Sequence, residues 1–134
     1  MKKLFALLTA LSLLLALTAC GGDSGSDDST GDRDTTTYKI GLCNYVDDAS
    51  LNQIVDNIQT QLEALGEENG VTFEVEYENC NADATVLNQI IANFIADDVD
   101  LMVGVGTPVA TAMQSATAGS GIPLVFSAVS DPVG

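Results

Sequence analysis

The side chains that most often carry catalysis are scarce in this chain. Its 134 residues include no histidine, which removes Ser-His-Asp and Cys-His catalysis together with most transition-metal sites. The 19 acidic residues offer carboxylates to a hard cation such as calcium, but no D-x-D-x-D-G loop is present. We therefore expect no catalytic residue, no metal and no cofactor, and we interpret most of the acidic residues as a solvated surface.

One stretch, "LMVGVGTPVATAM" at residues 101–113, nearly matches the G-x-G-x-x-G fingerprint of dinucleotide-binding proteins. Three features argue against a dinucleotide. The stretch follows the third expected strand rather than the first, and Val109 stands at the position of the last glycine. Phe126-Ser127 stands where an acidic residue would hold the ribose. We therefore interpret the stretch as a strand-to-helix turn that holds something other than a dinucleotide.

The N-terminus has the pattern of an exported protein. Lys2 and Lys3 precede an apolar run that suits a signal peptide but is shorter than the ~20 residues needed to span a bilayer. The run ends in Leu17-Thr18-Ala19-Cys20, which resembles the lipobox of bacterial lipoproteins. The resemblance implies a signal peptide at residues 1–19, cleavage before Cys20 and lipidation of its thiol. The alternative is an ordinary signal peptide that ends in a chance cysteine.

Residues 20–37 begin with that cysteine and are otherwise almost wholly Gly, Ser, Thr and Asp. Because they have no apolar surface to bury, we expect a disordered tether. After cleavage only Arg33 and Lys39 would remain against 19 acidic residues, which argues against nucleic acid and against binding to anionic lipid. We therefore expect the chain to lie at the outer face of the cytoplasmic membrane, in contact with the membrane through its lipid anchor only.

Residues 38–134 suffice for one small domain, in which strand and helix patterns alternate. Four strands are expected, at residues 38–44, 71–79, 101–105 and within 122–134. Three helices are expected: an amphipathic stripe from Leu51 to Leu65, residues 83–97, and a helix that opens at Thr107-Pro108. Thr107 is expected to cap the third helix, and Pro108 stands where its missing N–H costs nothing.

This order of elements predicts an α/β fold with a doubly wound parallel sheet and right-handed crossovers. The strictly alternating second strand suits an edge, whereas the first and third are apolar on both faces, which favours a four-stranded sheet in the order 2-1-3-4. The first helix is expected on one face and the other two on the opposite face, which would leave strands three and four uncovered on the first helix's side. Cys43 and Cys80 would lie near neighbouring strand ends and are candidates for a disulfide, although spacing alone does not show that they pair.

Four segments together resemble one family. "YKIGLCNYVDDASLN", "VTFEVEYENCNAD", "ADDVDLMVGVGTPVATAM" and "IPLVFSAVSDPVG" resemble, in this order, the ABC transporter substrate-binding proteins that include tryptophan and tyrosine binders. The resemblance covers residues 38–134 and implies the N-terminal lobe of a type I periplasmic-binding-protein fold, whose members normally close two lobes around a cleft. It implies an extracytoplasmic receptor that delivers an amino acid-like molecule to the permease subunits of an ABC importer. On this interpretation the chain is a truncated lobe that binds ligand poorly by itself.

The resemblance also implies a ligand site beyond the carboxyl ends of the strands, where the strand order reverses. Six residues form the candidate set: Asn44, Tyr45, Thr107, Pro108, Ser127 and Asp131. The N-terminus of the third helix, at Thr107, suits a ligand carboxylate. Asn44 and Ser127 can add neutral hydrogen bonds, Asp131 can pair with an ammonium, and Tyr45 can stack on an apolar or aromatic side chain. Three of them have a structural alternative, since Thr107 can cap its helix, Asp131 can shape a turn and Tyr45 can pack its loop.

Two other functions compete with the receptor. The first is a single-lobe surface lipoprotein that acts by protein–protein contact through its acidic or apolar face. The second is an enzyme or a receiver-type phospho-domain, because Asp47-Asp48 after the first strand resembles the acidic pair of receivers. Gly106 and Thr107 stand where the phospho-acceptor Asp would follow the third strand, and export also conflicts with that function.

Overall fold

The computed structural model describes residues 35–130. The predicted signal peptide, nearly all of the predicted tether, Cys20 and Asp131 lie outside the described residues. Within them the elements follow one another as β1 (Thr37–Asn44), α2 (Ala49–Asn69), β2 (Thr72–Asn79), α3 (Ala84–Ala96), β3 (Leu101–Val105), α4 (Thr107–Ala116) and β4 (Leu124–Ser127). None of the helices described is long and apolar enough to cross a membrane.

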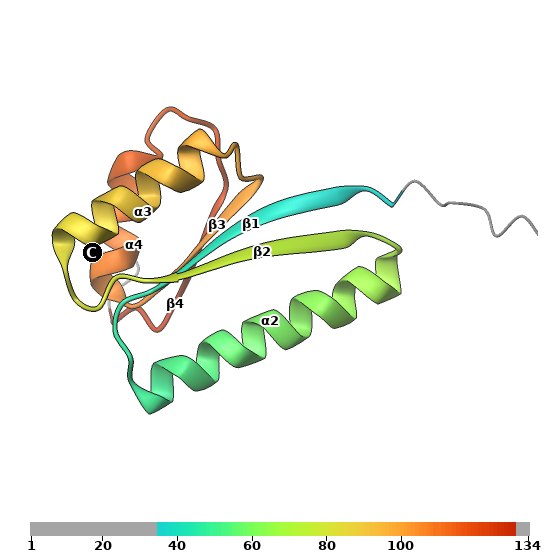
Figure 1. Ribbon diagram of the computed structural model, residues 1–134, viewed down its shortest axis with the longest axis horizontal. Coiled ribbons are helices and arrows are strands. Elements are labelled where there is room, and N and C mark those ends of the chain that lie inside the picture. The colour runs from blue at the N-terminus through green and yellow to red at the C-terminus, as the bar shows by residue number, and fades with distance from the viewer. Residues whose placement is uncertain (1–34, 131–134) are drawn as a thin grey trace, which may run out of the picture. The chain divides into compact units, whose positions relative to one another are not determined.

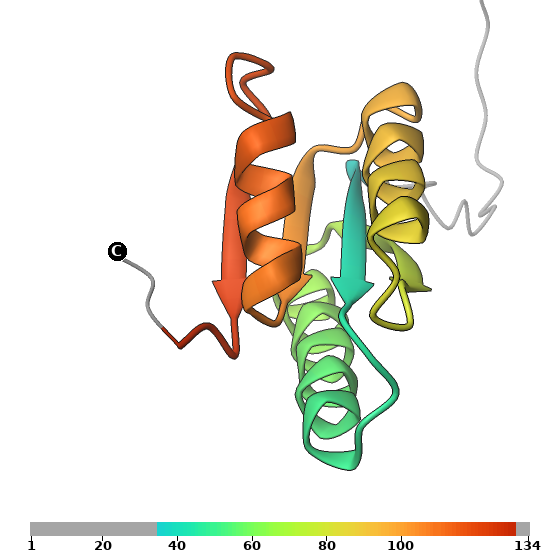
Figure 2. The ribbon, with the colours of Figure 1, turned by 90° about the vertical axis from the view of Figure 1, so that its left-hand side faces the viewer.

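The strands form one parallel sheet in the order β2-β1-β3-β4, which confirms the predicted topology. Figure 2 shows the arrowheads of β1, β3 and β4 pointing the same way, so their carboxyl ends meet at one edge of the sheet. The alternating strand β2 lies at the outer edge beside β1, as its half-polar pattern predicts.

The helices cover the two faces as predicted, with α2 on one side and α3 and α4 on the other (Figure 1). On the α2 side, Ile40 and Leu42 of β1 and Val103 and Val105 of β3 pack with Val55 of the helix. On the other side a second buried cluster joins residues of α3 and α4 to the sheet. Its members are Cys43, Cys80, Leu87, Ile90, Ile91, Phe94, Val99, Met102, Val109 and Met113.

The prediction that β3 and β4 are both uncovered on the α2 side is wrong for β3. Val103 is only 4% exposed and Val105 is fully buried, whereas Val125, the partner of Val103 on β4, is 50% exposed. The reason is the width of the helix: at about 10 Å, a helix spans more than one strand spacing of about 4.8 Å. The helix α2 therefore reaches β3 as well as β1 and β2, and within residues 35–130 only β4 remains uncovered on that face.

Local signals in the sequence set the ends of the first two helices. Asp48 caps α2, since its Oδ1 accepts from the backbone N–H of Ser50 at 2.9 Å, and Gly70 ends the helix in the left-handed conformation. Asp83 caps α3 in the same way. Backbone N–H groups of Val86 and Thr85 donate to its carboxylate and hold the pKa of Asp83 below its usual value.

Candidate functional site

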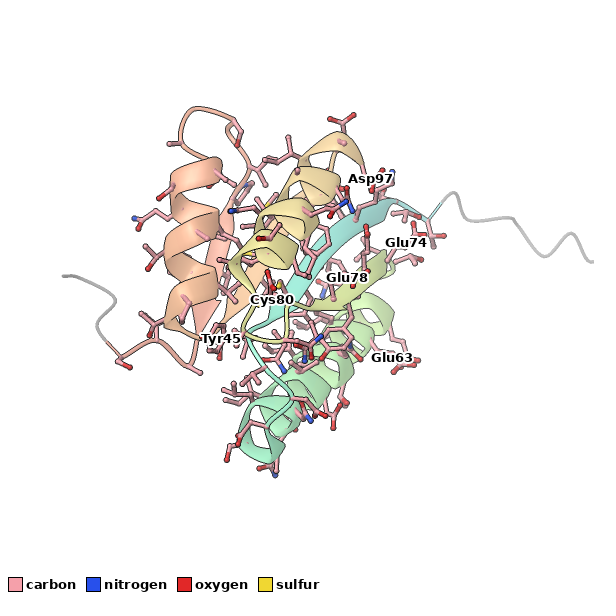
Figure 3. The ribbon with its side chains drawn as sticks, turned by 60° about the vertical axis from the view of Figure 1, so that its left-hand side comes forward. Tyr45, Glu63, Glu74, Glu78, Cys80 and Asp97 are labelled. Carbon is pink, nitrogen blue, oxygen red and sulfur yellow. The ribbon has the colours of Figure 1, made fainter. Side chains whose placement is uncertain are left out.

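Tyr45 sits directly beyond β1, and its backbone is held from two sides. Its N–H donates to the carbonyl oxygen of Val105 at 3.1 Å, which ties it to the end of β3. Its own carbonyl oxygen accepts from Ala82 N at 2.7 Å and from Cys80 Sγ at 3.2 Å, both in the loop between β2 and α3. Figure 3 shows Tyr45 and Cys80 near each other at the carboxyl end of β1. The Tyr45 side chain is half-buried and packs at the border of the cluster under α3 and α4.

The loop between β2 and α3 that supports Tyr45 was not predicted as part of the site. Two consecutive non-glycine residues in it, Asn81 and Ala82, have positive φ angles of 49° and 58°. Such a backbone is costly and persists only where surrounding contacts hold it. Those contacts include the bond from Ala82 N to Tyr45 and a bond from Asn81 N to Asn79 Oδ1 at 2.8 Å. The signal in the sequence is the segment "NCNAD" at residues 79–83, which ends an edge strand and contains the turn formers Asn and Asp.

The turn from β3 into α4 depends on Gly106, which has φ 101° and ψ 146° and occupies the N-cap position. A side chain is disfavoured there for two reasons: the conformation suits glycine, and an added Cβ would lie 3.0 Å from the Cβ of Tyr45. The prediction that Thr107 caps the helix is therefore wrong, because Thr107 is the first residue of α4. The chain reverses at Gly106, one residue earlier than the Thr-Pro pattern suggests.

No side chain within residues 35–130 caps α4, so among them its first-turn N–H groups are available to a ligand. Pro108 lies exposed in this first turn, where an N–H would have no partner within the helix, so the lack of one in proline costs nothing. The Thr107 hydroxyl bonds Ser130 in both directions: its Oγ1 accepts from Ser130 N at 3.1 Å and donates to Ser130 Oγ over a long 3.5 Å. Gly106 N also donates to the carbonyl oxygen of Ser127 at 2.9 Å. The ends of β1, β3 and β4 thus bring Tyr45, Thr107 and Ser127 to one edge of the sheet.

Asn44 differs from the other candidates because it is fully buried on the α2 side of the sheet. Its Nδ2 donates to the Val46 carbonyl at 3.0 Å and to Asn52 Oδ1 at 3.1 Å, and Asn52 Nδ2 in turn donates to Asp47 Oδ1 at 2.6 Å. A carbonyl and a carboxylate accept at the two ends of this chain, so the amide orientation follows from the network. Among the described residues, this arrangement leaves Asn44 Oδ1 as a buried acceptor with no partner.

Cys43 and Cys80 are both fully buried in the cluster under α3 and α4, and both are free thiols. Burial, together with contact with the Cys80 thiol, raises the pKa of Cys43 to about 12. Within residues 35–130, no three or more Cys, Asp or Glu side chains are grouped so as to hold a metal ion.

A parallel sheet in the order 2-1-3-4, with helices on both faces, is the fold of one lobe of periplasmic-binding-protein-like receptors. The sequence bears out this class, because the family described as ABC transporter substrate binding protein matches residues 39–134. The chain belongs to that family.

Relatives in this family include proteins whose ligands are known. A tyrosine-binding protein of Clostridioides difficile (strain R20291) is 31% identical over 136 residues, which cover 98% of this chain and 39% of the relative. A conserved domain protein from Vibrio cholerae O1 biovar El Tor strain N16961 has a TM-score of 0.66 and 34% identity, over 73% of this chain and 32% of its own. An ABC domain from Streptococcus pneumoniae, in complex with L-Trp, has a TM-score of 0.61 and 29% identity, over 70% of this chain and 30% of its own. The chain thus spans well under half the length of each relative.

Proposed function

We propose that this chain is an extracytoplasmic solute receptor of an ABC importer and that it binds an amino acid-like molecule at the carboxyl edge of its sheet. The observation that carries the proposal is the meeting of Tyr45 with the Gly106–Thr107 turn, where no side chain of the described residues caps the N-terminus of α4. An aromatic ring beside free N–H donors suits a ligand with a carboxylate and an apolar side chain. Relatives that bind tyrosine and L-Trp support this choice of ligand class.

Each candidate residue has a specific role in this proposal. The Thr107 O–H donates to Ser130 Oγ only over a long 3.5 Å, so it can turn to a ligand carboxylate while Oγ1 still accepts from Ser130 N. Tyr45 stacks on the ligand side chain, Ser127 adds a neutral hydrogen bond, and Asp131 pairs with the ammonium group. Pro108 shapes the first turn of α4. Asn44 contributes only through Oδ1, since its amide nitrogen is bonded to Val46 and Asn52.

We further propose that residues 35–130 form one wall of a cleft between two lobes. The L-Trp-bound relative supports this arrangement, because the chain covers 30% of that protein. In the same proposal, lipid on Cys20 anchors the receptor, and permease subunits take up the released ligand.

The experiment is calorimetric titration of amino acids, including L-Tyr and L-Trp, into the protein as its own cells export it. Thr107→Val removes the hydroxyl and keeps the shape, and it should weaken carboxylate binding about tenfold. Thr111→Val is the matched control, because Thr111 is exposed one turn further along α4 and its hydroxyl bonds only the Thr107 carbonyl among described residues. Equal affinities for the two variants, or the absence of amino acid binding by the exported protein, would overturn the proposal.

A second candidate function is a surface lipoprotein that acts by protein–protein contact. The observation that favours it is the half-exposed Val125 on the uncovered face of β4. The same titration separates the two functions, since only the receptor predicts saturable binding of a free amino acid that Thr107→Val weakens.

A further inference from the structure

The buried thiols of Cys43 and Cys80 come from different parts of the chain. Cys43 is the second-last residue of β1, and Cys80 directly follows β2. Both are 0% exposed, and both belong to the cluster that contains Phe94 and Leu87. No part of the proposed ligand site requires two thiols at this position.

Hydrogen bonds place the two sulfurs against the same short segment of backbone. Cys43 Sγ donates to the Asn44 carbonyl at 3.6 Å, and Cys80 Sγ donates to the Tyr45 carbonyl at 3.2 Å. Cys80 N also donates to the Asn44 carbonyl at 3.1 Å, which fixes the Cys80 backbone beside the end of β1. The thiols are moreover near enough to each other that Cys80 contributes to the raised pKa of Cys43. Both cysteines lie in the same buried cluster, near the ends of neighbouring strands.

We infer that Cys43 and Cys80 are joined by a disulfide in the mature protein, and that this bond locks the loop between β2 and α3 beneath Tyr45. The inference rests on the proposed extracytoplasmic location, because disulfides form and persist in oxidising compartments. It concerns a modification of the protein and holds whatever ligand the site binds.

The oxidant in this step is a disulfide, either of a small molecule or of an oxidoreductase. One cysteine thiolate attacks the oxidant's disulfide, which forms a mixed disulfide and releases one thiolate. The second cysteine then displaces the other half of the oxidant, so that one S–S bond replaces another and two protons pass to the released thiols. Burial keeps Cys43 protonated, with a pKa of about 12, so the reaction belongs to the folding chain rather than to the folded protein.

The bond would act on the strained part of the site. Asn81 and Ala82, which directly follow Cys80, hold their positive φ angles without glycine. A covalent tie at Cys80 limits the loop's freedom to relax away from Tyr45. The Tyr45 carbonyl loses the Cys80 thiol as a donor on oxidation, but it keeps Ala82 N at 2.7 Å. The support of Tyr45 is therefore retained in the oxidised protein.

The direct test is peptide mapping of the full chain, purified from its own cells after export. The protein is denatured in an alkylating reagent without reductant, digested and analysed by mass spectrometry. We expect a peptide pair that contains Cys43 and Cys80, lighter by two hydrogen atoms than the two free peptides together, with neither residue alkylated. Alkylation of both residues, or a link from either one to Cys20, would overturn the inference.

A second measurement tests the locking effect. Refolding the protein in reductant should lower the Tm by about 10 °C relative to the oxidised form, since the disulfide closes a loop between distant strands. The control is the double variant Cys43→Ala/Cys80→Ala, whose Tm should not respond to reductant. Equal Tm values for oxidised and reduced wild type would show that the bond does not lock the loop.

Discussion

At Gly106 the absence of a side chain lets β3 turn directly into α4 while Tyr45 packs against the turn. We expect Gly106→Ala to be more destabilising than Gly119→Ala, although both residues have positive φ. An added Cβ at Gly119 meets nothing within 4 Å, whereas at Gly106 it lies 3.0 Å from Tyr45 Cβ. The extra cost should be about 1–2 kcal/mol in urea unfolding, and only Gly106→Ala should weaken ligand binding. An equal loss of unfolding free energy in the two variants would mean that the Tyr45 side chain moves aside at no measurable cost.

The positions of single residues at the site were predictable only where they follow from where the strands end. Tyr45, Thr107 and Ser127 meet as expected, because parallel strands end at one edge of a sheet. The buried orientation of Asn44 was not predictable, since it depends on which face of β1 packs under α2. The support of Tyr45 by the Cys80 loop was missed because it depends on tertiary hydrogen bonds rather than on a sequence pattern.

At the scale of the elements, apolar periodicity predicted every strand and helix of the described residues, together with the sheet order. It did not predict that α2 covers β3, because a pattern along one segment carries no information about the width of its neighbour. Figure 2 shows α2 lying toward β1 and β3 and away from β4. Which strands a helix covers depends on tertiary packing, and substitutions on each strand can test it.

Val103 and Val125 are a matched pair for this test, since they are cross-strand partners on the same face of the sheet. We expect Val103→Thr to lower the free energy of unfolding by about 1–3 kcal/mol, because the hydroxyl is buried under α2. Val125→Thr should change it by less than about 0.5 kcal/mol, because Val125 is 50% exposed. Urea denaturation of both variants measures the difference. Similar losses at the two positions would show that another part of the protein covers β4.

For the molecule as a whole, charge is the most unusual property, with a formal net charge of −15 over 134 residues. Lys39 is the only Lys or Arg within residues 35–130. Glu74, Glu76 and Glu78 point to one face of β2, where Figure 3 shows Glu74 and Glu78 on the same side of the strand. Lys39 is the cross-strand partner of Glu74, whereas Glu76 is paired with Gly41 and has glutamates two residues away on both sides.

This arrangement predicts opposite effects of the same substitution at neighbouring positions. Glu76→Gln should raise stability by about 0.5 kcal/mol at low salt, because it relieves repulsion from both flanking glutamates. Glu74→Gln should give no gain, because it removes the neighbour of Lys39 together with one source of repulsion. Thermal unfolding at 10 mM and 500 mM NaCl measures both effects. The difference between the variants should vanish at high salt, where screening shortens the range of the charges to about 4 Å. A difference that persists at 500 mM NaCl would assign the effect to side-chain packing instead of to charge.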